Sequence, residues 1–218
     1  MTVHSRDETG TTNAAVRGER GPEAAVAVLL GGVLSLSSGA AVLGLVRETL
    51  HFNCSWGIGG EWGPDGTWVC ADGIGYAGVA VVLGGMSALL VIVGLVAAIS
   101  RPSRGRSIVL LTLAAISLGW ILWWTFYAAT SYSGPRPAGE TGWALWAVTV
   151  LPAILLSTVG LLVGAVGAFT RRSWSRVALW CGIGLMIAGT ALQLGVGIAT
   201  FLSAGLLAAA GVARTPAR

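Results

Sequence analysis

Lysine is absent from this 218-residue chain, and only 10% of its residues are charged, whereas 55% are hydrophobic. A soluble domain carries roughly 25% charged residues. A chain this short cannot hide so much apolar surface inside one particle, because small domains bury only part of their surface. Lipid therefore has to solvate the rest, which excludes a sizeable soluble domain. Missing lysine with abundant alanine, glycine and valine is typical of a GC-rich bacterial genome.

Groups that carry chemistry are also scarce. The chain has two histidines and three cysteines, and it lacks both the lysine of a phosphate-binding loop and any metal-ligand spacing. One cluster of titratable residues remains, all expected on one side of the membrane: Glu48, His51, Glu61, Asp65 and Asp72. No nucleophile stands in a recognisable setting beside it. We interpret the cluster as part of a solvated loop, and we expect no catalytic residue, cofactor or metal.

Five uncharged apolar runs follow a polar tail at residues 1–22, in which we expect disorder. Each run exceeds the ~20 residues that cross a hydrocarbon core as a helix. The predicted spans lie within a transmembrane domain at 23–213, followed by a short tail at 214–218, and cover residues 24–46, 75–99, 107–129, 143–169 and 177–201. Pro152 is expected to kink the fourth span. Cys181 in the fifth span is interpreted as a small buried hydrophobe.

Two alternatives remain open along these runs. The first run could be a cleaved signal peptide, although its 23 apolar residues exceed the usual ~7–15. The last run continues to residue 213, too long for one ~30 Å crossing. We favour a single crossing there, either as one tilted helix that frays at its end or as a span followed by an interfacial segment, because two full spans and a turn barely fit. The other interpretation is a hairpin of two short spans that turns near Gly195, Val196 and Gly197.

Arginine counts predict the orientation, because basic residues accumulate on the cytoplasmic side. Nine arginines lie in the tail and in the second–third and fourth–fifth connections, against four on the other side for a single last crossing. The N-terminus is therefore predicted in the cytoplasm and the protein in the plasma membrane. Arg214 and Arg218 would lie on the side with fewer arginines if the last run crossed once, so they favour the hairpin. Tryptophans near the ends of the third and fourth spans form the expected interfacial belts.

The outer loop at residues 47–72 is the candidate functional region. Cys54 and Cys70 bracket it, and an oxidising outer compartment predicts a disulfide that closes 17 residues and stabilises the loop by ~3 kcal/mol. Pro64-Asp65-Gly66 is typical of a turn at the tip of a short hairpin. The possible outer contact surface comprises Trp56, Trp62, Trp68, His51 and Asp65. Its tryptophans can hold a cation or sugar, or they can pack on each other, on the disulfide or on the membrane surface; we favour packing.

Small residues recur every four positions on several spans. Examples are Ala27, Gly31, Ser35 and Gly39 in the first span, Ala80, Gly84 and Ala88 in the second, and Gly160 and Gly164 in the fourth. Such rows let helix backbones approach closely. We expect them to pack mainly within one chain, with a homo-oligomer or membrane-protein partner as the alternative.

The sequence as a whole predicts an all-α fold: a polytopic helical membrane protein with about five transmembrane helices and one disulfide-closed outer loop. The expected function is non-enzymatic, as a structural, accessory or protein-interaction component of a bacterial envelope. The alternative is a carrier or channel for a small neutral or apolar solute. The expected partner is the lipid bilayer, with another membrane protein or a second copy of the chain as the alternative given above, and no nucleic acid is expected.

Overall fold

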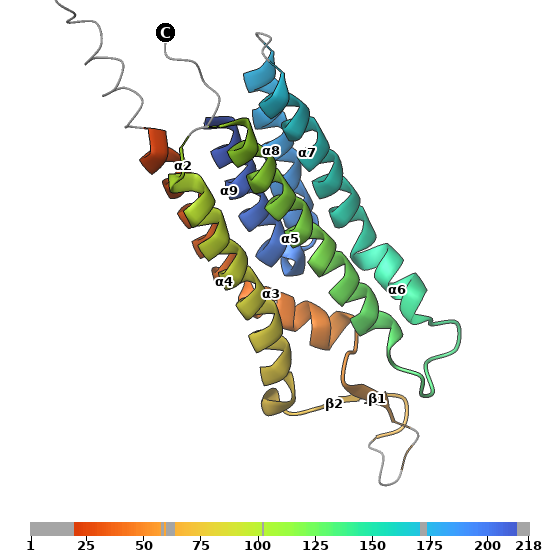
Figure 1. Cartoon of the computed structure of the whole chain (residues 1–218). Coiled ribbons are helices and arrows are strands. Elements are labelled where there is room, and N and C mark those ends of the chain that lie inside the picture. The colour runs from red at the N-terminus through yellow and green to blue at the C-terminus, as the bar shows by residue number, and fades with distance from the viewer. Residues whose placement is uncertain (1–19, 58, 60–63, 102, 171–173, 213–218) are drawn as a thin grey trace, which may run out of the picture.

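The computed structural model describes residues 20–57, 59, 64–101, 103–170 and 174–212. Most of the tail predicted at 1–22, the tail at 214–218 and Trp62 lie outside the described residues. The remainder is all-α apart from one small hairpin, as predicted (Figure 1). Its elements are α2 (Arg20–Ser37), α3 (Gly39–Gly44), the π-helical turn η1 (Leu45–Thr49), β1 (Cys54–Trp56), β2 (Trp68–Cys70), the 3-10 turn η3 (Gly73–Tyr76), α4 (Ala77–Ile99), α5 (Arg104–Thr130), α6 (Gly142–Thr149), α7 (Leu151–Phe169), α8 (Ser175–Leu192), the 3-10 turn η4 (Leu194–Val196) and α9 (Gly197–Val212).

Five helices are long and apolar enough to cross a membrane, but they are not the predicted five. They cover Gly73–Ile99, Arg104–Thr130, Leu151–Phe169, Ser175–Leu192 and Leu194–Val212. The expectation of one last crossing at 177–201 was wrong, because the backbone leaves the helix at Gln193 and turns back through η4. At 1.5 Å per residue, the α8 arm of this hairpin is about 27 Å long and the α9 arm about 24 Å, slightly less than a ~30 Å core.

The predicted first span is a bent pair of helices rather than one straight helix. Pro22–Ser37 and Gly39–Thr49 meet at 41° and would count as a sixth crossing. The bend lies at Ser38, whose hydroxyl donates to the Ser35 carbonyl oxygen at 2.6 Å, a local bond that competes with the helix ladder. Beyond it, α3 and η1 run across the end of the bundle toward α5 (Figure 1).

Three other details of the spans differ from what hydropathy alone predicts. The predicted kink near Pro152 is a break between α6 and α7 at Val150, with Pro152 in the first turn of α7. Arg106 lies inside the first turn of α5 and is buried, with its Nη1 donating to the Ser100 carbonyl oxygen at 2.9 Å. Cys181 was expected to be buried and is instead exposed on α8. An apolar thiol on that face meets lipid at little cost.

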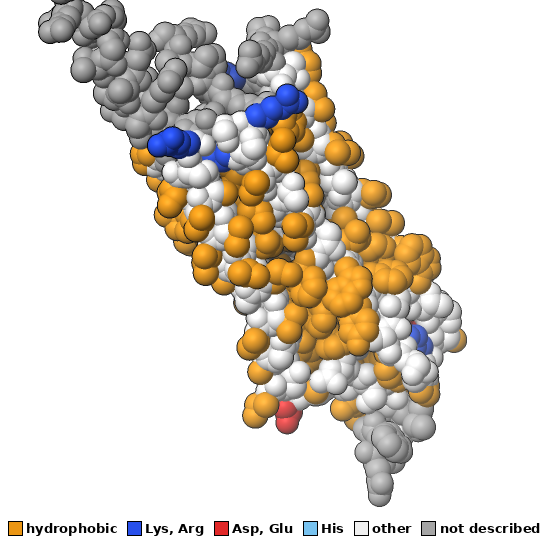
Figure 2. All heavy atoms as spheres, in the orientation of Figure 1, with side chains coloured by type: hydrophobic (Ala, Val, Ile, Leu, Met, Phe, Trp, Pro, Cys, Tyr) orange, Lys and Arg blue, Asp and Glu red, His pale blue; other side chains and the backbone are white. Residues whose placement is uncertain are grey.

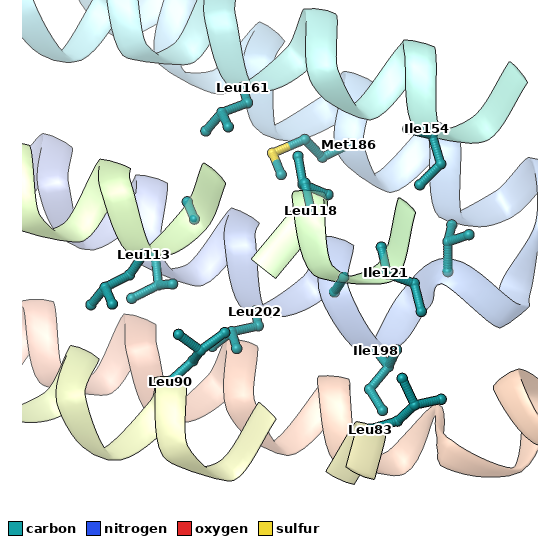
Figure 3. Packing of buried hydrophobic residues seen from close by; sticks show 14 of the residues in the cluster. Leu83, Leu90, Leu113, Leu118, Ile121, Ile154, Leu161, Met186, Ile198 and Leu202 are labelled. Atoms are coloured by element: carbon teal, nitrogen blue, oxygen red, sulfur yellow. The ribbon is translucent and has the colours of Figure 1, made fainter. Parts of the chain in front are cut away.

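The most buried helix is α9, which the other long helices surround. Leu202, Leu206 and Leu207 are fully buried, and the neighbouring Met186 of α8 meets Leu118 and Leu161 (Figure 3). Hydroxyls join α9 to its neighbours: Ser203 donates to the Ala114 carbonyl oxygen at 2.9 Å, and Ser117 donates to that of Ala199 at 3.3 Å. These two bonds set the register between α5 and α9. If that register is continued along the two antiparallel helices, the turn between α8 and α9 lies level with the tryptophans near the end of α5.

Several predicted rows of small residues do pack within the chain. A Cβ added at Gly31 would lie 2.8 Å from the Phe201 carbonyl oxygen and 2.9 Å from the Gly205 Cα, so α2 and α9 touch through their backbones. Gly160 approaches Gly182 of α8 in the same way. The α4 row differs, since a Cβ at Gly84 would meet nothing within 4 Å. Packing inside one chain therefore accounts for the α2 and α7 rows but not for that of α4.

The bundle has two chemically distinct ends. One end of the bundle holds the start of α2, the adjoining ends of α4 and α5 and of α7 and α8, and the end of α9 (Figure 1). Basic side chains gather at that end (Figure 2), which we call the arginine end. The opposite end carries the β-hairpin and the segment between α5 and α6. We call residues 50–76 and 131–141 together the loop cap.

Candidate contact surface at the loop cap

The hairpin of the loop cap is closed by the predicted disulfide. Strands β1 and β2 pair antiparallel, with Cys54 opposite Cys70 and Trp56 opposite Trp68. The two cysteine sulfurs are 2.02 Å apart. The predicted turn is present as well: the Gly66 amide donates to the Gly57 carbonyl oxygen at 3.0 Å, and Gly66 adopts a positive φ of 73° that suits glycine. Asp65 is exposed beside it.

A tight turn sets the direction in which the hairpin leaves η1. His51 and Asn53 adopt left-handed backbone conformations, with φ of 54° and 58°. Phe52 lies between them, and its ring contacts Trp124 and Tyr127 of α5 at centroid distances of 5.8 and 6.3 Å. The turn thereby seats the hairpin on the end of α5 and aims the His51 ring toward β2.

Trp68 is the centre of the loop cap. The His51 ring stacks on it at 4.2 Å with only 9° between the planes, and Trp56 contacts it edge-on at 5.3 Å. From the second segment, the Tyr132 ring contacts Trp68 at 5.5 Å, and the Trp56 amide donates to the Tyr132 hydroxyl oxygen at 3.2 Å. Aromatic contacts of this kind contribute ~0.5–1.5 kcal/mol each beyond burial. The two segments of the loop cap therefore pack as one unit, and Trp56 and Trp68 pack on each other.

The aromatic surface already holds a cation that belongs to the chain. The Arg136 guanidinium lies 5.1 Å from the Tyr132 ring centroid and 6.0 Å from that of Trp68. Its Nη2 also donates to the carbonyl oxygens of Ala129 and Tyr132, at 3.1 and 3.3 Å. A ligand cation that used these ring faces would have to displace Arg136, which leaves packing as the better account of this cluster.

The carboxylate that meets His51 was not among those expected. Glu140 Oε1 lies 3.8 Å from His51 Nδ1, too far for a hydrogen bond, and neither atom has another hydrogen-bond partner. Burial lowers the pKa of His51, Glu140 raises it and Arg136 lowers it again. Glu61 lies outside the described residues. No group of three potential metal ligands occurs among the described histidine, cysteine and acidic residues.

The residues that sequence reasoning missed all come from residues 131–141. Tyr132, Arg136 and Glu140 are far from the hairpin in sequence, and no periodicity links the two segments. One signal was available: Arg136 and Glu140 are the only charged residues between the aromatic ends of the third and fourth predicted spans. Charges confined to a short connection between interfacial belts lie at the surface with the other loop.

Two hollows open beside the disulfide. The larger measures about 540 Å³ and is lined by Phe52, Asn53, Cys54, Ser55, Val69, Cys70, Ala71, Ser131 and Tyr132. The smaller measures about 440 Å³ and is lined by Arg47, Glu48, His51, Trp68 and Cys70. Both are shallow and lie at the loop cap, and the smaller one extends onto η1 at Arg47 and Glu48. Amide and hydroxyl groups in the larger hollow can form hydrogen bonds with a chain laid across it.

An aromatic band separates the loop cap from the apolar bundle. Trp123 and Trp143 are each 55% exposed, and the space-filling view shows a broad hydrophobic patch toward the loop-cap end (Figure 2). Trp146, beside Trp143, is instead buried and donates its indole N–H to the Thr125 hydroxyl oxygen at 3.1 Å. Trp174 and Trp180 are exposed near the arginine end. Rings of this kind at both ends of apolar helices are typical of the two membrane interfaces.

The fold and these two aromatic levels define a polytopic helical membrane protein with a disulfide-closed loop cap. No protein-family model, curated protein or solved structure matches the chain.

Proposed function

We propose that this chain is a plasma-membrane protein of a bacterial envelope, without enzymatic activity, that acts through protein contacts made by its loop cap outside the cell. The observation that carries the proposal is the packing of two distant outer segments around Trp68. A surface that is rigid before binding loses less conformational entropy when a partner docks, so it suits recognition.

The hairpin of α8 and α9 supports the orientation. The end of α9 lies at the arginine end, and Arg214 and Arg218 follow it directly in the sequence. Six crossings therefore assign eleven arginines to one side and leave Arg47 and Arg136 on the other. Under the positive-inside rule, the arginine end faces the cytoplasm and the loop cap faces outward. The arginines that opposed a single last crossing now agree with the others.

The interior of the bundle favours contact over transport. A carrier for a small solute needs a path between helices, and α9 occupies the centre, with 11 of its 16 residues buried. Its neighbours touch it through glycine backbones and leucine side chains. The two hollows described above lie on the loop cap instead. We therefore rank the contact function above the carrier hypothesis.

Site-specific photocrosslinking in native membranes tests the proposal. A photoreactive residue at Val69, which is exposed on β2, is expected to capture a defined protein. The same residue at Ile187, which is exposed on α8 within a span, is the matched control. Capture must disappear when Trp68→Ala is combined with the probe at equal membrane levels. Capture that survives Trp68→Ala, or that occurs equally from position 187, would contradict a contact surface on the loop cap.

A further inference from the structure

Arg106 of α5 is a buried cation whose charge no described acidic residue neutralises. Its side chain is only 3% exposed, and the one ion pair among the described residues, His51 with Glu140, lies at the loop cap instead. A buried charge without a counter-charge is unfavourable, and charged side chains at membrane depth normally have a partner. The single carbonyl bond that Arg106 makes leaves most of its charge unbalanced. The guanidinium therefore suits an anion supplied from outside the chain.

The guanidinium is held so that one of its edges stays free. Nη1 of Arg106 donates to the Ser100 carbonyl oxygen at 2.9 Å. Nε and Nη2 are shielded from solvent and have no hydrogen-bond partner. These two nitrogens lie on the same edge of the planar group and donate in parallel, which is the arrangement that binds two oxygens of one phosphate or carboxylate. The unused donors thus form one complete bidentate site.

The start of α5 adds further donors beside this edge. Helical side chains point back toward the N-terminus, so the Arg106 guanidinium lies next to the first turn, in agreement with its bond to Ser100. The Ser107 amide donates to the Ser103 carbonyl oxygen, and this bond begins the helical ladder. The first two amides of α5 precede it. They carry the partial positive charge of a helix N-terminus, which binds phosphate groups readily.

We propose that the free edge of Arg106 holds one phosphate group at the arginine end of the bundle. Trp174 and Trp180 are exposed near the same end and are typical of the level at which lipid headgroups lie. Phospholipids present phosphodiesters at that level, so a membrane lipid is the expected source of the phosphate. Free phosphate from the aqueous phase offers the same chemistry, and the experiment below separates the two sources.

The site lies just beneath the surface of the arginine end. Ser100, Arg101 and residues 103–105 are exposed on either side of it in the sequence. Arg101 and Arg104 attract anions toward this surface. A phosphate that binds displaces the groups that cover the free edge, and its oxygens become the acceptors that Nε and Nη2 lack. This site depends on neither the loop cap nor the direction of insertion, so its test is independent of the crosslinking experiment.

Native mass spectrometry of the full-length protein measures the site. The protein is delipidated in detergent and titrated with phosphatidylglycerol, and we expect one lipid to bind more tightly than the rest. Arg106→Lys keeps the charge but loses the bidentate edge, so it should weaken this step about tenfold. Arg104→Gln removes an exposed arginine from the same helical turn and is the matched control, with an expected change of about threefold at most. Equal weakening by both variants would overturn the proposal, because it would indicate diffuse attraction alone.

A second measurement reads the contact in the unmodified protein and does not depend on how well a variant folds. Solid-state NMR of nitrogen-labelled arginine detects dipolar coupling between phosphorus and the guanidinium nitrogens. One sample contains phosphatidylglycerol bilayers, and the other contains phosphorus-free detergent with inorganic phosphate. We expect coupling to an Nε signal in the bilayer sample that Arg106→Lys lacks. Coupling with inorganic phosphate alone would keep the site and assign it to free phosphate. Absence of that coupling from both samples would overturn the proposal.

Discussion

Gly160 of α7 and Gly182 of α8 approach so closely that a Cβ added at Gly160 would lie 2.6 Å from the Gly182 carbonyl oxygen. A Cβ at Gly182 would lie 2.5 Å from the Gly160 carbonyl oxygen. The atoms on both sides are backbone, so no side chain can move to make room. This reciprocal contact sets the separation of the two helices.

Gly160→Ala is therefore expected to destabilise the folded bundle by about 1–3 kcal/mol, the usual cost of overpacking. Gly184→Ala, two residues beyond Gly182 on α8, is the matched control, because its Cβ would meet nothing within 4 Å. Denaturant unfolding in mild detergent measures both. Equal stability of the two variants would mean that α7 and α8 do not touch through these glycines.

The six-crossing topology predicts that both termini face the cytoplasm. A fluorescent-protein fusion after Arg218 should be bright and an alkaline phosphatase fusion at the same point inactive. Impermeant thiol labelling in intact cells should modify cysteines introduced at Gly60 and Ala138 and spare those at Ser103 and Ser173. An active phosphatase fusion with the same labelling pattern would restore a single last crossing. Reversed labelling would invert the whole orientation.

The disulfide predicts a specific peptide map. Unreduced digests should contain one species that links Cys54 to Cys70, and Cys181 should react with a membrane-permeant alkylating agent. Replacing both loop cysteines with serine should lower hairpin stability by about 3 kcal/mol, because the unfolded loop is no longer constrained. Hydrogen exchange at the Gly57 amide reports that loss. Free thiols at both positions in protein purified without reductant would contradict the oxidised loop cap.

Shape rather than titratable groups should govern partner binding at neutral pH. Trp68→Ala removes the side chain on which His51, Trp56 and Tyr132 meet, and Cys54→Ser opens the hairpin. Both, with Trp62→Ala as predicted from the sequence, should weaken crosslinking more than His51→Asn or Asp65→Asn. Crosslinked product is quantified at matched membrane levels. If His51→Asn alone abolished crosslinking at pH 7.5, an acid–base role at the loop cap would become the better account.

Most of the spans were predictable, but the division of the last apolar run into two helices was not. Run length above ~20 apolar residues finds α4, α5 and α7, because uncharged runs of that length are expected to cross a membrane as helices. The turn between α8 and α9 escapes the same test because its residues Leu194 and Val196 are as apolar as the helices. Gln193 is its single polar marker, and its Oε1 accepts from the Gly195 amide at 3.3 Å. Arg214 and Arg218, which follow α9 in the sequence, did indicate a hairpin.

In the loop cap, only the features that depend on residues close together in the sequence were predictable. Cysteine spacing and compartment predict the disulfide, and Pro64, Asp65 and Gly66 predict the turn. The contacts of Trp68 with Tyr132 and Arg136 depend instead on how α4 and α5 bring two distant connections together. That arrangement follows from helix packing, in which glycine and serine contacts with α9 decide the positions. The placement of the two connections side by side cannot be inferred from a single sequence without knowledge of the tertiary contacts.

The burial of α9 has a consequence for how the protein is made. The central helix α9 follows the other described helices in the sequence, so α2, α4, α5 and α7 are made before their common core exists. Until then, Ser35, Ser107 and Ser117 lack the α9 carbonyl oxygens that their hydroxyls reach in the finished bundle. The nascent chain therefore exposes these serine hydroxyls to lipid during biogenesis. We expect its assembly to depend on the insertion machinery holding the early helices until the final hairpin arrives.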